Sequence, residues 1–158
     1  MRNFISMLAM VAVGAGVASA AAAQTARDFR GASPYEQIKD EPPPRLIVDP
    51  PFEAALAQGV FQAQYRVENL RIENVFGPAA VGVSPRLGHL HVIVDDLPWW
   101  WADASDNNTV DVANLPPGPH KVTIQLVNPN HQVFPGQVVT LKFTVPPRTG
   151  ASHGHQHR

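Results

Sequence analysis

Two histidines in the run 88–92 have the spacing of a metal site on a β-strand. His89 and His91 lie two positions apart, and side chains so spaced on a strand point the same way, about 6.6 Å apart. Two such imidazoles can bind one metal ion. Asp95 has the same parity and could be a third ligand, or an acceptor that fixes an imidazole tautomer. In the alternative interpretation, Ile93 shares this face, and the histidines simply lie on a partly exposed sheet.

Two more histidines lie where they could complete such a site. His120 begins a strand whose inward residues are apolar, and a bond from its imidazole to a backbone carbonyl at a sheet corner is favoured over a ligand role. His131 follows Asn128-Pro129-Asn130, which is typical of a turn. It can reach His89 and His91 only if its loop folds toward that edge.

The ligand types restrict the metal. The sequence has no cysteine, and its three methionines, at positions 1, 7 and 10, fall in a segment expected to be removed. Imidazole and carboxylate ligands then favour Cu(II) or Zn(II), and a blue-copper site with a cysteine ligand is excluded. His153, His155 and His157 near the end of the chain could bind an ion loosely, deliver one to the domain, or have no role.

Three consecutive tryptophans suggest a different function. Trp99, Trp100 and Trp101 follow a proline, and neighbouring strand residues point to opposite faces, so all three cannot easily be buried. We expect at least one ring in the core, and a remaining ring could form a flat platform. The alternative to metal binding is therefore a structural or ligand-binding sandwich that contacts a sugar or a protein.

Other functional classes lack a signal in this sequence. No Gly-x-Ser-x-Gly elbow, phosphate loop, HExxH or cysteine nucleophile is present, so we do not expect an enzyme. The net charge is −1 and the lysines and arginines are scattered. This distribution does not predict nucleic-acid binding.

The first residues predict export. Residues 1–23 combine an early arginine, a nearly apolar run and a stretch of alanines with several possible cleavage positions, as in a signal peptide. The apolar run is shorter than the roughly 18 residues that a membrane span needs. We therefore expect a periplasmic or secreted protein without a stable membrane anchor after processing.

The remaining chain predicts one all-β domain. Residues 24–45 are polar and end in three prolines, which indicates an extended arm. From 46 to 147, apolar residues alternate with polar ones and prolines separate the runs, as in a β-sandwich. Residues 148–158 are small and polar, and we expect a disordered tail.

Several blocks of the domain resemble a family of uncharacterised exported bacterial proteins. The blocks are GHLHV at 88–92, the VDD.PW.WAD pattern at 94–103, PGPHKV at 117–122 and NP.H at 128–131. The strand, corner and strand at 109–122 also resemble those of immunoglobulin-like and fibronectin-like sandwiches. The resemblance implies an exported sandwich and no particular activity. It makes His89, His91, His120 and His131 a set to test together.

Overall fold

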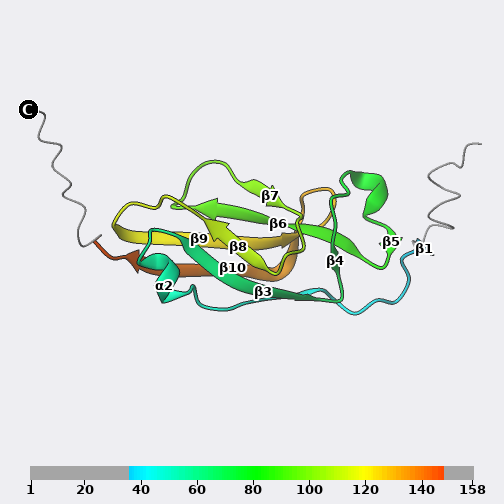
Figure 1. The fold of residues 1–158 in the computed structure, drawn as a ribbon. Helices are drawn as coiled ribbons and strands as arrows, with labels where there is room; N and C mark the ends of the chain where they lie inside the picture. Colours follow the sequence, from blue (N-terminus) through cyan, green and yellow to red (C-terminus); the bar gives the residue numbers. More distant parts are fainter. Residues whose placement is uncertain (1–35, 148–158) are drawn as a thin grey trace, which may run out of the picture. The chain divides into compact units, whose positions relative to one another are not determined.

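The computed structural model of the protein describes residues 36–147 (Figure 1). The predicted signal peptide, most of the arm and the tail at 148–158 lie outside the described residues. Within the described part, strands predominate and the only α-helix is α2 (Glu53–Leu56), a single turn. In residues 36–147, no helix is long and apolar enough to cross a membrane.

A three-stranded antiparallel sheet forms one layer. Its order is β2 (Arg45–Val48), β3 (Phe61–Glu68) and β8 (Thr109–Val112). In β3, Phe61, Ala63 and Tyr65 are buried. The intervening glutamines and arginine are more exposed, so the strand has the predicted alternation.

A five-stranded sheet forms the second layer. The main order is β10 (Val133–Val145), β9 (Gly118–Val127), β6 (Leu87–Val94) and β4 (Arg71–Ile72), while β7 (Trp101–Asp103) pairs with another part of β6. All of these pairings are antiparallel except that between β4 and β6. Strand β6 is thus central and has hydrogen-bonded neighbours along both edges.

Two short strands and a 3-10 turn lie outside the two main sheets. β1 (Glu36–Gln37) pairs antiparallel with β5 (Val83–Ser84). The 3-10 turn, Pro78–Ala80, follows Gly77, whose φ of 104° is in the region that favours glycine.

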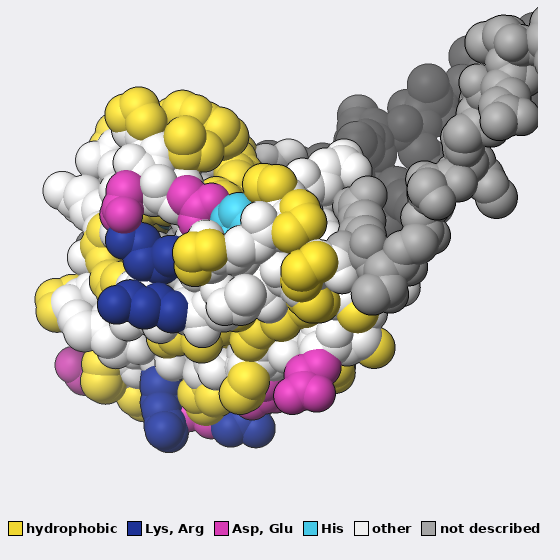
Figure 2. Space-filling model, turned by 90° about the vertical axis from the view of Figure 1, so that its left-hand side faces the viewer, with side chains coloured by type: hydrophobic (Ala, Val, Ile, Leu, Met, Phe, Trp, Pro, Cys, Tyr) yellow, Lys and Arg dark blue, Asp and Glu magenta, His cyan; other side chains and the backbone are white. Residues whose placement is uncertain are grey.

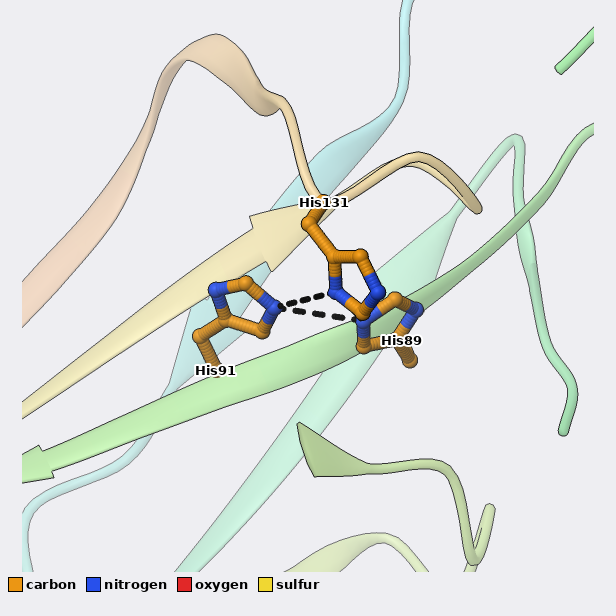
Figure 3. A group of neighbouring side chains, drawn as sticks. All are labelled: His89, His91 and His131. Atoms are coloured by element: carbon orange, nitrogen blue, oxygen red, sulfur yellow. Dashed lines mark hydrogen bonds between the residues drawn. The ribbon is translucent and has the colours of Figure 1, made fainter. Parts of the chain in front are cut away.

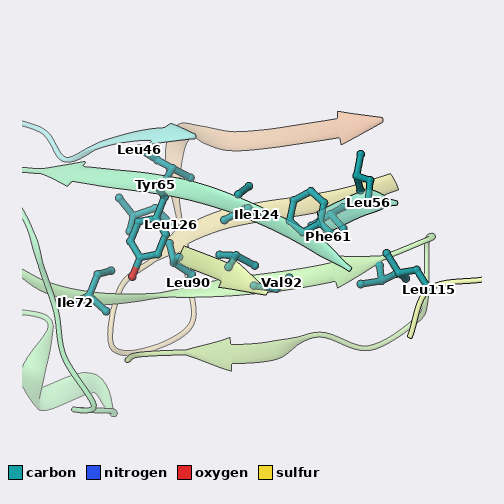
Figure 4. Packing of buried hydrophobic residues seen from close by; sticks show 14 of the residues in the cluster. Leu46, Leu56, Phe61, Tyr65, Ile72, Leu90, Val92, Leu115, Ile124 and Leu126 are labelled. Carbon is teal, nitrogen blue, oxygen red and sulfur yellow. The ribbon is translucent and has the colours of Figure 1, made fainter. Parts of the chain in front are cut away.

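One apolar core lies between the two main sheets (Figure 4). Burying a large aliphatic or aromatic side chain contributes about 1.5–3 kcal/mol, and both layers supply such residues. The inward residues of β6 and β9 are Leu90, Val92, Val94, Val122, Ile124 and Leu126. The prediction of an all-β domain is confirmed, and so is the prediction that these apolar residues share one face of their strands.

Strand β6 is unusual because both of its faces are buried. Its inner face packs in the core, and on its outer face His89 is 0% exposed and His91 is 3% exposed. Seven of the eight residues of β6 are buried, and Ile93 is half-buried. The outer face is therefore covered, in contrast to the partly exposed face of the alternative interpretation.

The first prediction concerns Gly88, where β6 packs closely against its neighbours. A Cβ atom at Gly88 would lie 2.4 Å from the carbonyl oxygen of Val127 and 2.9 Å from Cδ1 of Leu70. Gly88→Ala should therefore lower the free energy of unfolding by about 1–3 kcal/mol. Denaturant unfolding measures this loss. Gly82→Ala, with no atom within 4 Å of its Cβ, is the control, and equal losses in both variants would contradict the explanation.

Candidate metal centre

The β9–β10 turn carries His131 back to strand β6. The Asn128 side chain organises this turn, because its Oδ1 accepts hydrogen bonds from the amides of Asn130 and Gln132, at 2.9 and 3.0 Å. The amide of His131 donates to the carbonyl of Asn128, and His131 has a φ of 63°. In the ladder, Val127 of β9 lies opposite His89 of β6, so the turn begins beside the histidine pair.

Three imidazole nitrogens meet at this point (Figure 3). Nε2 of His89 lies 3.2 Å from Nε2 of His91, and Nδ1 of His131 lies 3.1 Å from each of them. Metal–imidazole bonds are about 2.0–2.1 Å long, so nitrogens at these separations would subtend roughly 100° at a shared ion, near the tetrahedral angle of about 109°. We call His89, His91 and His131 the histidine triad.

Burial keeps two members of the histidine triad neutral. Burial, with a further contribution from the charge of His131, lowers the pKa of His89 to about 4. Burial also lowers the pKa of His91 to about 4, helped by the charges of His89 and His131. Neutral imidazole is the form that binds metal, so both rings are in that form near pH 7.

Two aromatic rings pack against the histidine triad. Trp100 stacks on His91, with ring centroids 3.5 Å apart and planes 12° apart. Phe76 stacks on His131 at 5.7 Å and meets His89 edge to face at 4.9 Å. Each contact restricts the rotation of an imidazole, which holds the three nitrogens in place.

Sequence reasoning missed Phe76 and gave Trp100 a different role. Phe76 lies in the loop after β4, and its position along the chain gives no indication of contact with His89 or His131. Trp101 packs, partly buried, against the core, while Trp99 is 53% exposed. Trp100 stacks on His91 and is 43% exposed, and the rings of Trp99 and Trp101 are tilted by 41°, so the three rings do not lie in one plane.

Asp95 and His120 do not join the histidine triad. Among the described residues, the triad is the group of His, Cys, Asp or Glu donors close enough to share an ion. Asp95 follows the end of β6 and has a φ of 48°. The alternation of a strand, which predicted that Asp95 shares a face with His91, therefore does not extend to it. Its carboxylate instead accepts a hydrogen bond from Nδ1 of His120 at 2.6 Å and from the amide of Lys121 at 2.8 Å.

His120 makes the corner contact that the sequence favoured, and it also binds Asp95. Its Nε2 lies 2.8 Å from the carbonyl oxygen of Pro116. Both ring nitrogens therefore face acceptors, an arrangement that favours the doubly protonated imidazolium. Figure 2 shows this end of the molecule, with a histidine next to acidic side chains and basic side chains below them.

The pKa values of this pair follow from the contacts. The hydrogen bond with Asp95 raises the pKa of His120 above its usual 6.5, and burial opposes the change only in part. Burial pushes the pKa of Asp95 upward, but the hydrogen bonds from His120 and from the amide of Lys121 outweigh it and lower that pKa. Each group thus stabilises the charged form of the other.

Comparison with known proteins gives one match. A family model covers residues 1–156. The chain belongs to this family of unknown function, DUF6130. No curated protein and no solved structure matches the chain. Membership in DUF6130 agrees with the predicted resemblance to an uncharacterised family, and it assigns no activity to the histidine triad.

The second prediction concerns the His120 corner of this DUF6130 domain. His120→Ala should lower the free energy of unfolding by about 1–2 kcal/mol at pH 5, because a charged hydrogen bond is lost. The loss stays in this range because Asp95 is partly exposed and water screens the interaction. The pKa of His120 is raised in the folded state. Its stabilising effect is therefore complete below pH 6.5 and decreases as the pH rises through the folded-state pKa.

Denaturant unfolding of the wild type and of His120→Ala at a series of pH values measures this difference. The difference should be smaller at pH 9 than at pH 5. A difference that does not change over this range would contradict a charged His120.

Proposed function

We propose that this chain is an exported metal-binding domain whose histidine triad holds a copper or zinc ion. The observation that supports the proposal is the triangle of ring nitrogens, 3.1–3.2 Å on each side. Three histidines with no other protein ligand leave a further coordination position for water or another molecule. Such a site suits the binding and exchange of an ion.

A cation explains the convergence of these rings better than hydrogen bonds among them. Each ring nitrogen has one in-plane position, which holds either a proton or a lone pair. Only one proton fits inside the triangle, so lone pairs of the other two nitrogens lie against each other. A metal ion at that position replaces this repulsion with three bonds.

The other nitrogen of His89 is not satisfied by a hydrogen bond in the described part of the chain. Within residues 36–147, the buried Nδ1 of His89 has no hydrogen-bond partner, which costs about 1–3 kcal/mol. A buried ring that is unsatisfied at one nitrogen must be held in place by other interactions. A metal bond at Nε2 would offset this cost.

The compartment and the finer fold class are part of the proposal. The predicted signal peptide at 1–23 supports a periplasmic or secreted location. The corner at 109–122 and the two facing sheets support an immunoglobulin-like sandwich. The chain has no cysteine, so the domain would not depend on disulfides in an oxidising compartment.

The third prediction tests the metal ligands. In the full chain carrying His153→Ala, His155→Ala and His157→Ala, which we call the tail-substituted chain, Cu(II) and Zn(II) should each bind at about one equivalent. A further His131→Ala or His91→Ala should weaken binding by more than about 100-fold, because loss of a ligand exceeds the 10–100-fold effect of losing its supporting contacts. Calorimetric titration measures both quantities.

His120→Ala is the matched control, since it removes an imidazole outside the histidine triad. It should leave the metal affinity unchanged while it lowers stability. If His131→Ala and His120→Ala had equal effects on binding, the histidine triad would not be the metal site.

The fourth prediction uses Trp100 as a reporter. A Cu(II) ion bound to His91 would lie close to the stacked indole of Trp100 and should quench its fluorescence. In the tail-substituted chain, Trp100→Phe should remove most of the Cu(II)-dependent quenching. Trp99→Phe, which alters an exposed ring, should leave the quenching in place, and the opposite pattern would locate the ion elsewhere.

A further inference from the structure

The donor atoms of the histidine triad carry no negative charge. The group of clustered donors consists of three imidazoles and contains no carboxylate. Asp95 is bonded to His120 and Lys121, and Glu73, in the segment that follows β4, pairs with Arg71 at 2.8 Å. An ion bound to three neutral ligands keeps its full charge.

On the side of His89 and His91 the surroundings of the histidine triad solvate that charge poorly, while His131 is exposed. His89 and His91 are 0% and 3% exposed, and the rings of Phe76 and Trp100 cover their sides. The free energy of placing an ion in a medium of low polarity increases with the square of its charge, so a divalent ion suffers about four times the penalty of a monovalent ion of equal size.

We propose that the histidine triad selects monovalent copper, Cu(I), over divalent ions. This inference rests on the proposed function, since it requires that the triad binds a metal at all. Imidazole is a ligand that copper accepts. Binding replaces the ligands that Cu(I) carried before with three ring nitrogens, and no electron is transferred.

Phe76 provides a direct test, because its ring contacts two of the three ligands and is 46% exposed. Phe76→Glu would place a carboxylate next to the ion, while Phe76→Gln has nearly the same shape without the charge. The difference between these two variants isolates the effect of charge. A carboxylate should favour the divalent ion.

The experiment measures affinities for ions of both charges in the tail-substituted chain. Cu(I) binding is measured without oxygen, with ascorbate present, by competition against a chromophoric Cu(I) chelator. Cu(II) and Zn(II) binding is measured by competition in the absence of reductant. Ag(I), a monovalent ion that does not change oxidation state here, is an independent probe.

We expect Cu(I) to bind at least about tenfold more tightly than Cu(II) or Zn(II), and Ag(I) to compete with Cu(I) for the site. The ratio of Cu(I) to Cu(II) affinity should be at least about tenfold lower in Phe76→Glu than in Phe76→Gln, a difference of about 1.4 kcal/mol. Divalent ions that bind as tightly as Cu(I), or equal ratios in the two variants, would overturn this inference. If no ion binds at the triad, the proposed function itself is wrong.

Discussion

The burial of both faces of β6 is the constraint on which the rest of the structure depends. A central strand covered on its inner face by the core and on its outer face by loops gives its polar side chains little access to water, so they depend on partners within the protein. His89 and His91 occupy the outer face, where their Nε2 atoms meet each other and Nδ1 of His131. The close packing of this strand also explains Gly88, where the chain has no room for a Cβ atom.

The position of His131 in the triad depends both on strand register and on the structure of the turn that carries it. His89 and His131 are 42 residues apart in the chain, yet β9 is hydrogen-bonded to β6 and ends opposite His89. The Asn128 side chain then closes the turn that follows. Two ligands on a strand and a third on a braced turn beside it form a site with little freedom to rearrange.

The sequence predicts the strands and the pair at 89 and 91 because both depend on a period of two residues. Parity fails at Asp95, since the strand ends at Val94 and a residue with positive φ no longer follows the pleat. The choice of His131 over Asp95 depends on where a turn folds, and the contacts of Phe76 and Trp100 depend on loops. No periodicity in the sequence encodes those positions.

Histidine has opposite charge preferences in the histidine triad and at the corner beside Asp95. His120 lies between a carboxylate and a carbonyl oxygen, so its environment favours the imidazolium. His89 and His91 lie among aromatic rings and each other, and burial lowers their pKa values to about 4. As the pH falls below 6.5, His89 and His91 take up protons in the unfolded chain but stay neutral in the folded one, and this difference destabilises the folded state. The pKa of His120 is raised in the folded state, so His120 keeps its hydrogen bonds at low pH. Acid should therefore disrupt the triad before the corner, and an ion in the triad would oppose that loss by holding both rings in the neutral form.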